Sequence, residues 1–204
     1  MKRSTDEGNK MNLARLYDWL TRPPVNGARA TLVVRFMAGG VFFWEGLLKF
    51  VYVNQGVGRF TKLGMPLPDV LAPAIAVLEI GGGLLVMSGL FTRLITIAFI
   101  VEMMVAILST KVALYFGTSP LPAPASPPKM GAWAVLHEIR SDYAQIMTSI
   151  FLLVAGPGPW SLDALLARRR SRADKMRATS SIDANDPAAT RPTQGGAHGR
   201  TAAV

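Results

Sequence analysis

The sequence predicts an all-α protein: an integral membrane, antiparallel four-helix bundle with both termini in the cytoplasm. Three observations carry this prediction. Four apolar stretches of about 20 residues each are long enough to cross a bilayer as helices. The connections between them are either very short or rich in glycine and proline, which favours antiparallel neighbours. Basic residues gather at the two ends of the chain, and the positive-inside rule places such flanks in the cytoplasm.

The composition excludes several classes of protein. The 204 residues are 50% hydrophobic and include no cysteine. Disulfides, thiol redox chemistry, thiolate-bound clusters and a thiolate haem ligand are therefore excluded. A redox role would need a bound small molecule or a partner protein. The formal net charge is +9, and the basic residues lie next to the apolar spans. This placement favours anionic lipid headgroups as partners and argues against nucleic acid.

Residues 1–29 predict a cytoplasmic amphipathic segment. Leu13, Leu16, Tyr17 and Leu20 recur at helical spacing, so we expect a short helix lying on the membrane. The two prolines that follow stop it. No continuous apolar core is found in the first 30 residues, and no cleavable signal peptide is predicted.

Residues 30–53 predict the first span, which is rich in charge. Arg35, Glu45 and Lys49 fall on one helical stripe, and such a stripe faces the bundle interior or a watery cavity. Glu45 and Lys49 also form an i,i+4 pair in the favourable order. Gly39, in the same span, is a candidate for close helix packing. An internal ion pair and a ligand site both stay open as interpretations.

Residues 70–91 predict the second span, around which the rest of the chain is organised. Its one carboxylate, Glu79, shares a helical face with the small residues Ala72, Ala76 and Gly83. Such a face admits another helix at close range and turns the acid toward protein. We interpret a set of glycines in this span as a close-contact surface: Gly81, Gly82, Gly83 and Gly89. A structural glutamate and a functional one are equally compatible with this pattern.

Residues 94–115 predict the third span. Only Thr92 and Arg93 separate it from the second, so the two spans form an antiparallel hairpin. Glu102 lies among small residues on one face of this span. The proline-rich stretch 117–131 that follows cannot be regular helix and is expected to be an extended loop.

Residues 134–155 predict the fourth and weakest span, with His137 and Asp142 in its first third. Ser161 is placed to cap a short interfacial helix, and the sequence beyond it predicts a disordered tail. These elements define three regions: a cytoplasmic N-terminal segment (1–29), a four-helix transmembrane domain (30–166) and a basic disordered cytoplasmic tail (167–204).

Each predicted span carries one acid, and the four acids are Glu45, Glu79, Glu102 and Asp142. A di-iron bundle would need two Glu-x-x-His pairs, but the sequence has only His137 and His198, so no metal site is predicted. We interpret the polar residues of the spans as one intramembrane pocket in the outer half of the bundle, in which Lys49 serves both Glu45 and Glu79. Its predicted members are Glu45, Lys49, Glu79, Glu102, His137 and Asp142.

Several segments together resemble the DoxX family of small bacterial membrane proteins. They are RFMAGGVFFWEGLLKF, FTKLGMPLP, LEIGGGLLVMSGLFTR, HEIRSDY and GPGPWSLD, and they cover about residues 31–165. The resemblance implies a four-helix membrane fold in the bacterial inner (cytoplasmic) membrane. It also implies a link to redox chemistry. Some relatives are subunits connected with quinone reduction, including thiosulfate:quinone oxidoreductase, and others belong to membrane complexes that handle oxidative stress or thiols.

We therefore expect a multi-pass subunit or accessory of a quinone-linked redox complex (thiosulfate:quinone or oxidative-stress related), which is not a self-sufficient catalyst. No intrinsic cofactor is expected, and quinone is the candidate ligand. The expected partners are membrane lipids and membrane redox subunits, with a homo-oligomer also open. Two rival functions stay open as well: a proton-coupled carrier component and a purely structural membrane partner.

Overall fold

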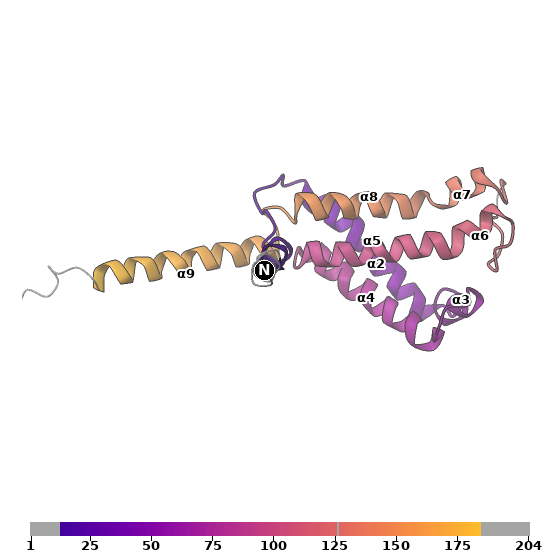
Figure 1. Ribbon diagram of the computed structural model, residues 1–204, viewed down its shortest axis with the longest axis horizontal. Coiled ribbons are helices and arrows are strands. Elements are labelled where there is room, and N and C mark those ends of the chain that lie inside the picture. Colours follow the sequence, from indigo (N-terminus) through magenta and orange to yellow (C-terminus); the bar gives the residue numbers. More distant parts are fainter. Residues whose placement is uncertain (1–12, 126, 185–204) are drawn as a thin grey trace, which may run out of the picture. The chain divides into compact units, whose positions relative to one another are not determined.

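The computed structural model describes residues 13–125 and 127–184. These residues form helices and connecting segments without any strand, which confirms the all-α prediction (Figure 1). The chain divides into two units after Leu166. The helical elements are residues 13–21, α2 (Thr31–Val51), α3 (Val57–Lys62), α4 (Pro68–Ser88), α5 (Thr92–Ala106), a π-helical turn η1 (Ile107–Lys111), α6 (Val112–Tyr115), α7 (Ala132–Glu138), α8 (Arg140–Ala155) and α9 (Leu162–Ala184).

Three helical stretches are long and apolar enough to cross a membrane: Thr31–Val51, Pro68–Ser88 and Thr92–Tyr115. The third consists of α5, η1 and α6 in continuous succession. Of the most apolar 18 residues in each stretch, only 33%, 33% and 17% are buried within the chain. The remaining apolar surface faces outward, as it does where lipid tails cover a helix. These stretches correspond to the first three predicted spans.

The fourth predicted span, 134–155, is not one helix. Helix α7 ends at Glu138, Ile139 adopts a turn conformation (φ −82°, ψ −3°), and α8 begins at Arg140. The side chain of Arg140 bonds back to the backbone carbonyl of His137, and a carbonyl with such a partner no longer depends on the helical ladder. With 16 residues, α8 extends about 24 Å and is shorter than a bilayer core of about 30 Å.

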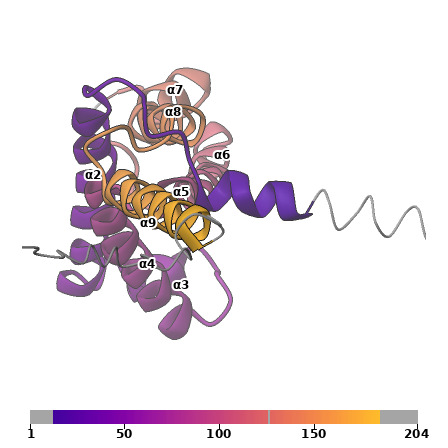
Figure 2. The same ribbon diagram turned by 90° about the vertical axis from the view of Figure 1, so that its left-hand side faces the viewer.

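The four longest helices of the first unit pack in two main pairs. Helix α2 lies against α4 and α5 lies against α8, with smaller contacts between α2 and α8 and between α4 and α5. Figure 1 shows α5 and α8 side by side, and Figure 2 shows the same helices after a quarter turn. At their centre the rings of Phe42 and Phe99 stack, with centroids 3.6 Å apart and planes 13° from parallel. Ala38, Val86 and Leu152 complete this core.

Glycines bring α2 and α4 into backbone contact. A Cβ atom on Gly39 would lie 2.6 Å from the carbonyl oxygen of Gly83, and one on Gly83 would lie 2.6 Å from that of Gly39. Gly82 faces α5 instead, where a Cβ would meet the Phe99 ring at 2.8 Å. A Cβ on Gly81 would meet open space, so the predicted packing surface does not extend to Gly81 within this chain.

The segments that flank the spans follow the sequence in part. The predicted N-terminal helix is present over residues 13–21. Ser161 caps α9 by accepting a hydrogen bond from the backbone N–H of Ala164 at 3.1 Å, as predicted. Helix α9 continues to Ala184, so the tail is helical where disorder was expected. No glycine or proline interrupts the sequence 162–184, and arginine, alanine, leucine and lysine are good helix formers. The remaining tail, 185–204, lies outside the described residues.

Candidate functional site

A buried ion pair joins α2 to α4. The Lys49 Nζ atom lies 2.6 Å from both carboxylate oxygens of Glu79, so the ammonium donates to each of them. Glu79 is 1% exposed, and the Lys49 side chain is also largely covered. A charge in such a place needs a partner, because leaving either one alone would be strongly unfavourable. The sequence analysis predicted that Lys49 serves Glu79, and this contact is confirmed.

A glycine that the sequence analysis missed makes this pair possible. A Cβ on Gly46 would lie 2.7 Å from the Ala76 carbonyl oxygen and 3.0 Å from the Glu79 Cβ. The α2 and α4 backbones therefore approach closely one turn before Lys49. This proximity allows the lysine side chain to reach Glu79. The available signal was a small residue three positions before a lysine inside an apolar span.

Glu102 of α5 adds a second carboxyl group to the pair. Glu79, Lys49 and Glu45 all interact electrostatically with it. Its Oε2 atom is buried and has no hydrogen-bond partner among the described residues. One ammonium group cannot neutralise two carboxylates, so this cluster of Lys49, Glu79 and Glu102 becomes neutral only with one further proton or cation.

Glu45 stands at the edge of this cluster. It is exposed, and no ion pair joins it to Lys49 in the part of the chain that the structure describes, so the predicted i,i+4 pair is wrong. The physical reason is that Glu79, across the α2–α4 contact, offers both of its oxygens at 2.6 Å in a dry environment. Glu45 still acts electrostatically on Glu102 and on Asp142.

The two predicted members from the fourth span behave differently from each other. Asp142 has a buried Oδ2 without a hydrogen-bond partner among the described residues, and Lys111, Arg59 and Glu45 act on its charge. His137 is exposed, and its Nδ1 lies 2.8 Å from the Arg140 side chain. The break between α7 and α8 leaves His137 on a separate short helix, so the prediction that it closes the buried cluster is wrong.

Arg35, which the sequence placed on the same stripe as Glu45 and Lys49, lies near the opposite end of α2. It is 1% exposed, and its Nη2 donates to the Trp160 carbonyl oxygen at 2.5 Å. Asp163 acts on its charge, and its guanidinium packs against Gly89, which ends α4 with φ +71°. A side chain at Gly89 would collide with this guanidinium, so Gly89 is a packing position at a helix end.

Arg93 holds the same end of the molecule together. Its Nε donates to the Leu153 carbonyl oxygen at 2.9 Å, its Nη1 to that of Trp19 at 2.7 Å and its Nη2 to that of Val154 at 3.2 Å. The guanidinium carbon also lies 4.2 Å from the centre of the Trp19 ring. The first turn of α5 therefore fixes the end of α8 and the N-terminal helix. Sequence reasoning treated Arg93 only as a turn residue.

Comparison with known proteins agrees with this architecture. A sequence model of the DoxX family matches residues 30–112, which include Lys49, Glu79, Glu102 and Arg93. The chain is 36% identical over 149 residues to "Uncharacterized membrane protein Rv3486" of Mycobacterium tuberculosis, a match over 70% of this chain and 85% of the relative. It is 30% identical over 133 residues to "Putative oxidoreductase CatD" of Bacillus subtilis, a match over 65% of this chain and 84% of the relative.

No solved structure matches the chain. The two relatives are matched over most of their own length, so the similarity covers their general organisation as well as a local motif. On these findings, the chain belongs to the DoxX family and is a membrane protein.

Proposed function

We propose that this chain is a multi-pass subunit of the bacterial inner membrane that serves a quinone-linked redox system. In this proposal α2, α4 and the stretch α5–α6 cross the membrane, and α7 with α8 forms the fourth crossing. The basic residues before α2 and in α9 then place both termini in the cytoplasm. The cluster of Lys49, Glu79 and Glu102 is the site where the subunit handles protons.

The observation that carries the proposal is the surplus acid in this cluster. Lys49 already holds both oxygens of Glu79, and Glu102 contributes a further carboxyl with an unpartnered buried oxygen. Acidic groups inside membrane spans are rare and mark proton and substrate pathways. A carboxyl group that can gain or lose a proton without breaking the Lys49–Glu79 pair is suited to proton transfer.

The residues present fit a quinone headgroup. A bound quinone would supply two-electron chemistry that consumes two protons on reduction. The Lys49 ammonium has three N–H donors and uses two on Glu79, which leaves one for a carbonyl oxygen. Glu102 can hold a proton or accept one at its unpartnered Oε2. Exposed apolar side chains of α2 and α4 suit an isoprenoid tail as well as lipid.

A partner subunit would supply the electrons. The chain contains no cysteine, so a thiol or a thiolate-bound cluster of its own is excluded. A relative carries the name oxidoreductase, which supports a redox setting. We accordingly assign this chain the quinone-facing and proton-handling part of a larger membrane oxidoreductase.

Quinone recovery from gently purified protein tests this function. Native membranes would supply the wild type, Glu102→Gln and the matched control Asp69→Asn, whose acid is exposed in the first turn of α4. Glu102→Gln keeps the Lys49–Glu79 pair, so the fold is expected to persist. We expect stoichiometric quinone with the wild type and the control, and about tenfold less with Glu102→Gln, since a hydrogen bond to a charged group contributes about 1.5–3 kcal/mol. Equal recovery from all three proteins, or none from the wild type, would refute the quinone site.

A proton-coupled carrier is the second candidate, because the same surplus acid could accompany a solute. Proteoliposomes with an internal pH dye separate the two functions. Solute-driven acidification that disappears in Glu102→Gln would favour the carrier. If the solute causes no acidification of the vesicles and the purified protein contains quinone, the redox subunit is favoured.

A further inference from the structure

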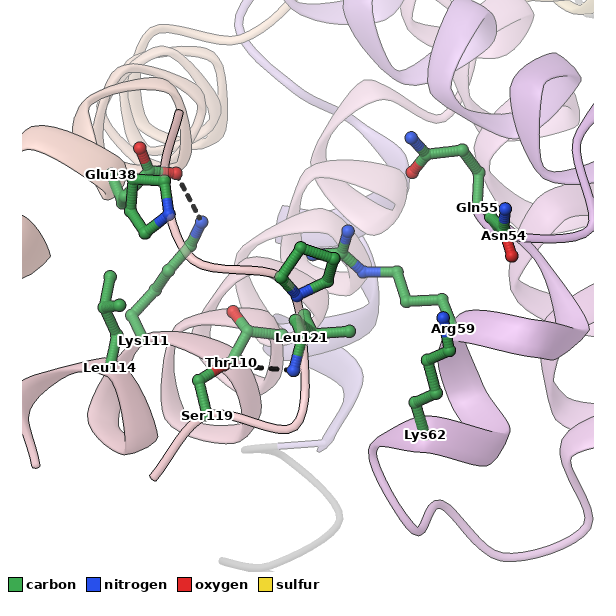
Figure 3. A pocket seen from close by; sticks show the side chains of 12 residues that line it. Asn54, Gln55, Arg59, Lys62, Thr110, Lys111, Leu114, Ser119, Leu121 and Glu138 are labelled. Carbon is green, nitrogen blue, oxygen red and sulfur yellow. Dashed lines mark hydrogen bonds and ion pairs between the residues drawn. The ribbon is translucent and has the colours of Figure 1, made fainter. Parts of the chain in front are cut away.

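A cavity of about 360 Å³ lies at the α3 end of the membrane-spanning helices. Helix α3, the turn η1 and the proline-rich loop after α6 supply most of its wall, and α7 supplies Glu138. Figure 3 shows Arg59 and Lys62 on one side of the cavity and Lys111 with Glu138 on the other. The residues of the Lys49–Glu79–Glu102 cluster do not line it.

The charges of this wall favour an anion. Three cationic side chains line the cavity against one acidic side chain. The acid is already engaged, since Glu138 Oε2 lies 3.7 Å from Lys111 Nζ. Arg59 and Lys62 form no ion pair within the residues that the structure describes. Asp142 of α8 does not line the cavity but interacts electrostatically with Lys111 and Arg59. Three cationic side chains against Glu138 and Asp142 still leave a net positive charge. A concave site of one sign concentrates ions of the other.

The neutral residues of the wall suit an oxygen-rich ligand. Asn54 and Gln55 bring amide groups to the same side as Arg59 (Figure 3). The arginine fork matches paired oxygens of one group, and amide N–H donors can bond the remaining oxygens. In Figure 3 the Arg59 guanidinium points into the space between the amides and the Lys111–Glu138 pair. The volume is near the lower limit of about 300–1,000 Å³ for ligand pockets, which fits a small ligand.

The wall is fixed by contacts of its own. The Lys111–Glu138 pair ties η1 to α7. The Ser119 hydroxyl oxygen accepts a hydrogen bond from the Leu121 N–H at 3.2 Å, where the loop passes the cavity. Thr110, in the π-helical turn, donates to the Ala106 carbonyl oxygen at 2.6 Å. A π-helical turn inside an α-helix is a frequent mark of functional sites.

We propose that this cavity binds a tetrahedral oxyanion, with Arg59 and Lys62 as its principal ligands. The same chemistry is found in a free phosphate-type ion and in the headgroup phosphate of an anionic lipid, because the cavity adjoins the ends of membrane-spanning helices. The site is separate from the quinone proposal and does not depend on it.

Thermal stability of the purified full-length protein in detergent tests the site. The probes are inorganic phosphate, chloride at matched ionic strength, and short-chain phosphatidylglycerol compared with short-chain phosphatidylcholine. The variants are Arg59→Gln/Lys62→Gln and the control Lys129→Gln/Arg168→Gln, which removes two exposed basic residues that do not line the cavity. Circular dichroism would establish that both variants retain their helices.

We expect phosphate or phosphatidylglycerol to raise the melting temperature of the wild type and the control. The Arg59→Gln/Lys62→Gln variant should need at least about tenfold more of the same probe, since two charge-assisted contacts are lost. A response to phosphate alone identifies a free oxyanion, and a response to phosphatidylglycerol alone identifies a lipid headgroup. Equal responses of the two variants, or a chloride response as large as that of phosphate, would overturn the proposal.

Discussion

The Lys49 ammonium on α2 donates hydrogen bonds to both carboxylate oxygens of Glu79 on α4, each at 2.6 Å. Two helices that each carry an unfavourable charge into an apolar environment thus cancel it between them. The pair fixes the rotation of α2 against α4, because either helix turned by one residue would separate the two groups. Glu102 of α5 interacts with both members of this pair.

The first prediction is that Lys49 is coupled to Glu79 and not to Glu45. Lys49→Leu should destabilise the protein by about 3–5 kcal/mol, because it leaves a buried acid unpaired. The double variant Lys49→Leu/Glu79→Gln should lose clearly less than the sum of the two single variants. The measurement is the free energy of unfolding in detergent for each protein in the cycle.

Lys49→Leu/Glu45→Gln is the matched control, and its two effects should add. Coupling to Glu45 with additivity at Glu79 would contradict the geometry described here.

The second prediction concerns the approach of α2 to α4 at Gly46. Gly46→Ala should lower the melting temperature, because its methyl group would lie 2.7 Å from the Ala76 carbonyl oxygen. Gly40→Ala is the matched control on the same helix, where a Cβ meets nothing within 4 Å. That change should be neutral or stabilising by up to about 1 kcal/mol, through helix propensity. If the two variants have the same melting temperature, close packing at Gly46 is not important to the fold.

The third prediction concerns Arg93 and its three carbonyl acceptors. Arg93→Lys retains the charge but cannot reach Leu153, Val154 and Trp19 at once, because an ammonium lacks the planar fork. We expect a loss of about 2 kcal/mol or more from the missing charged hydrogen bonds. Arg22→Lys, at an exposed ion pair of 3.4 Å with Asp18, should change stability by less than about 0.5 kcal/mol. Similar melting of the two variants would show that Arg93 is not a structural anchor.

The fourth prediction follows from the proposed four crossings. Reporter fusions at Gly64 and Gly131 should report the outer side of the membrane, and a fusion at Val204 should report the cytoplasm. Fusions to alkaline phosphatase and to a fluorescent protein would give complementary signals. The same signal at Gly131 and Val204 would rule out the crossing by α7 and α8.

The sequence was sufficient for features that depend on local pattern. The apolar lengths of the first three spans, the inward face of Glu79 and the cap at Ser161 all follow from residues that are close along the chain. The sequence analysis named both Glu45 and Glu79 as acids served by Lys49, and the contact with Glu79 is found. The pattern alone could not choose between the two acids, because Glu79 becomes a neighbour of Lys49 in space only through the close approach at Gly46.

The differences elsewhere have similar causes. The turn at Ile139 is accompanied by a bond from the Arg140 side chain to the His137 carbonyl, and hydropathy alone cannot detect such a local break in a helix. Helix α9 continues because its residues favour helix locally, although their low hydrophobicity predicted disorder. The cavity beside α3 gathers Arg59, Lys62 and Lys111 from separate elements, and no spacing in the sequence links them.

Arg93 also joins parts of the chain that the ribosome synthesises at different times. Its acceptor at Trp19 is synthesised first, but those at Leu153 and Val154 emerge about 60 residues after Arg93. Until α8 has been made, this guanidinium lies at the start of an apolar helix with one of its three carbonyl partners in existence. The two contacts of Arg93 with the end of α8 can therefore form only after that helix has been synthesised. A chain that stops before Leu153 would lack two of the three carbonyl acceptors of Arg93, and we expect it to be degraded.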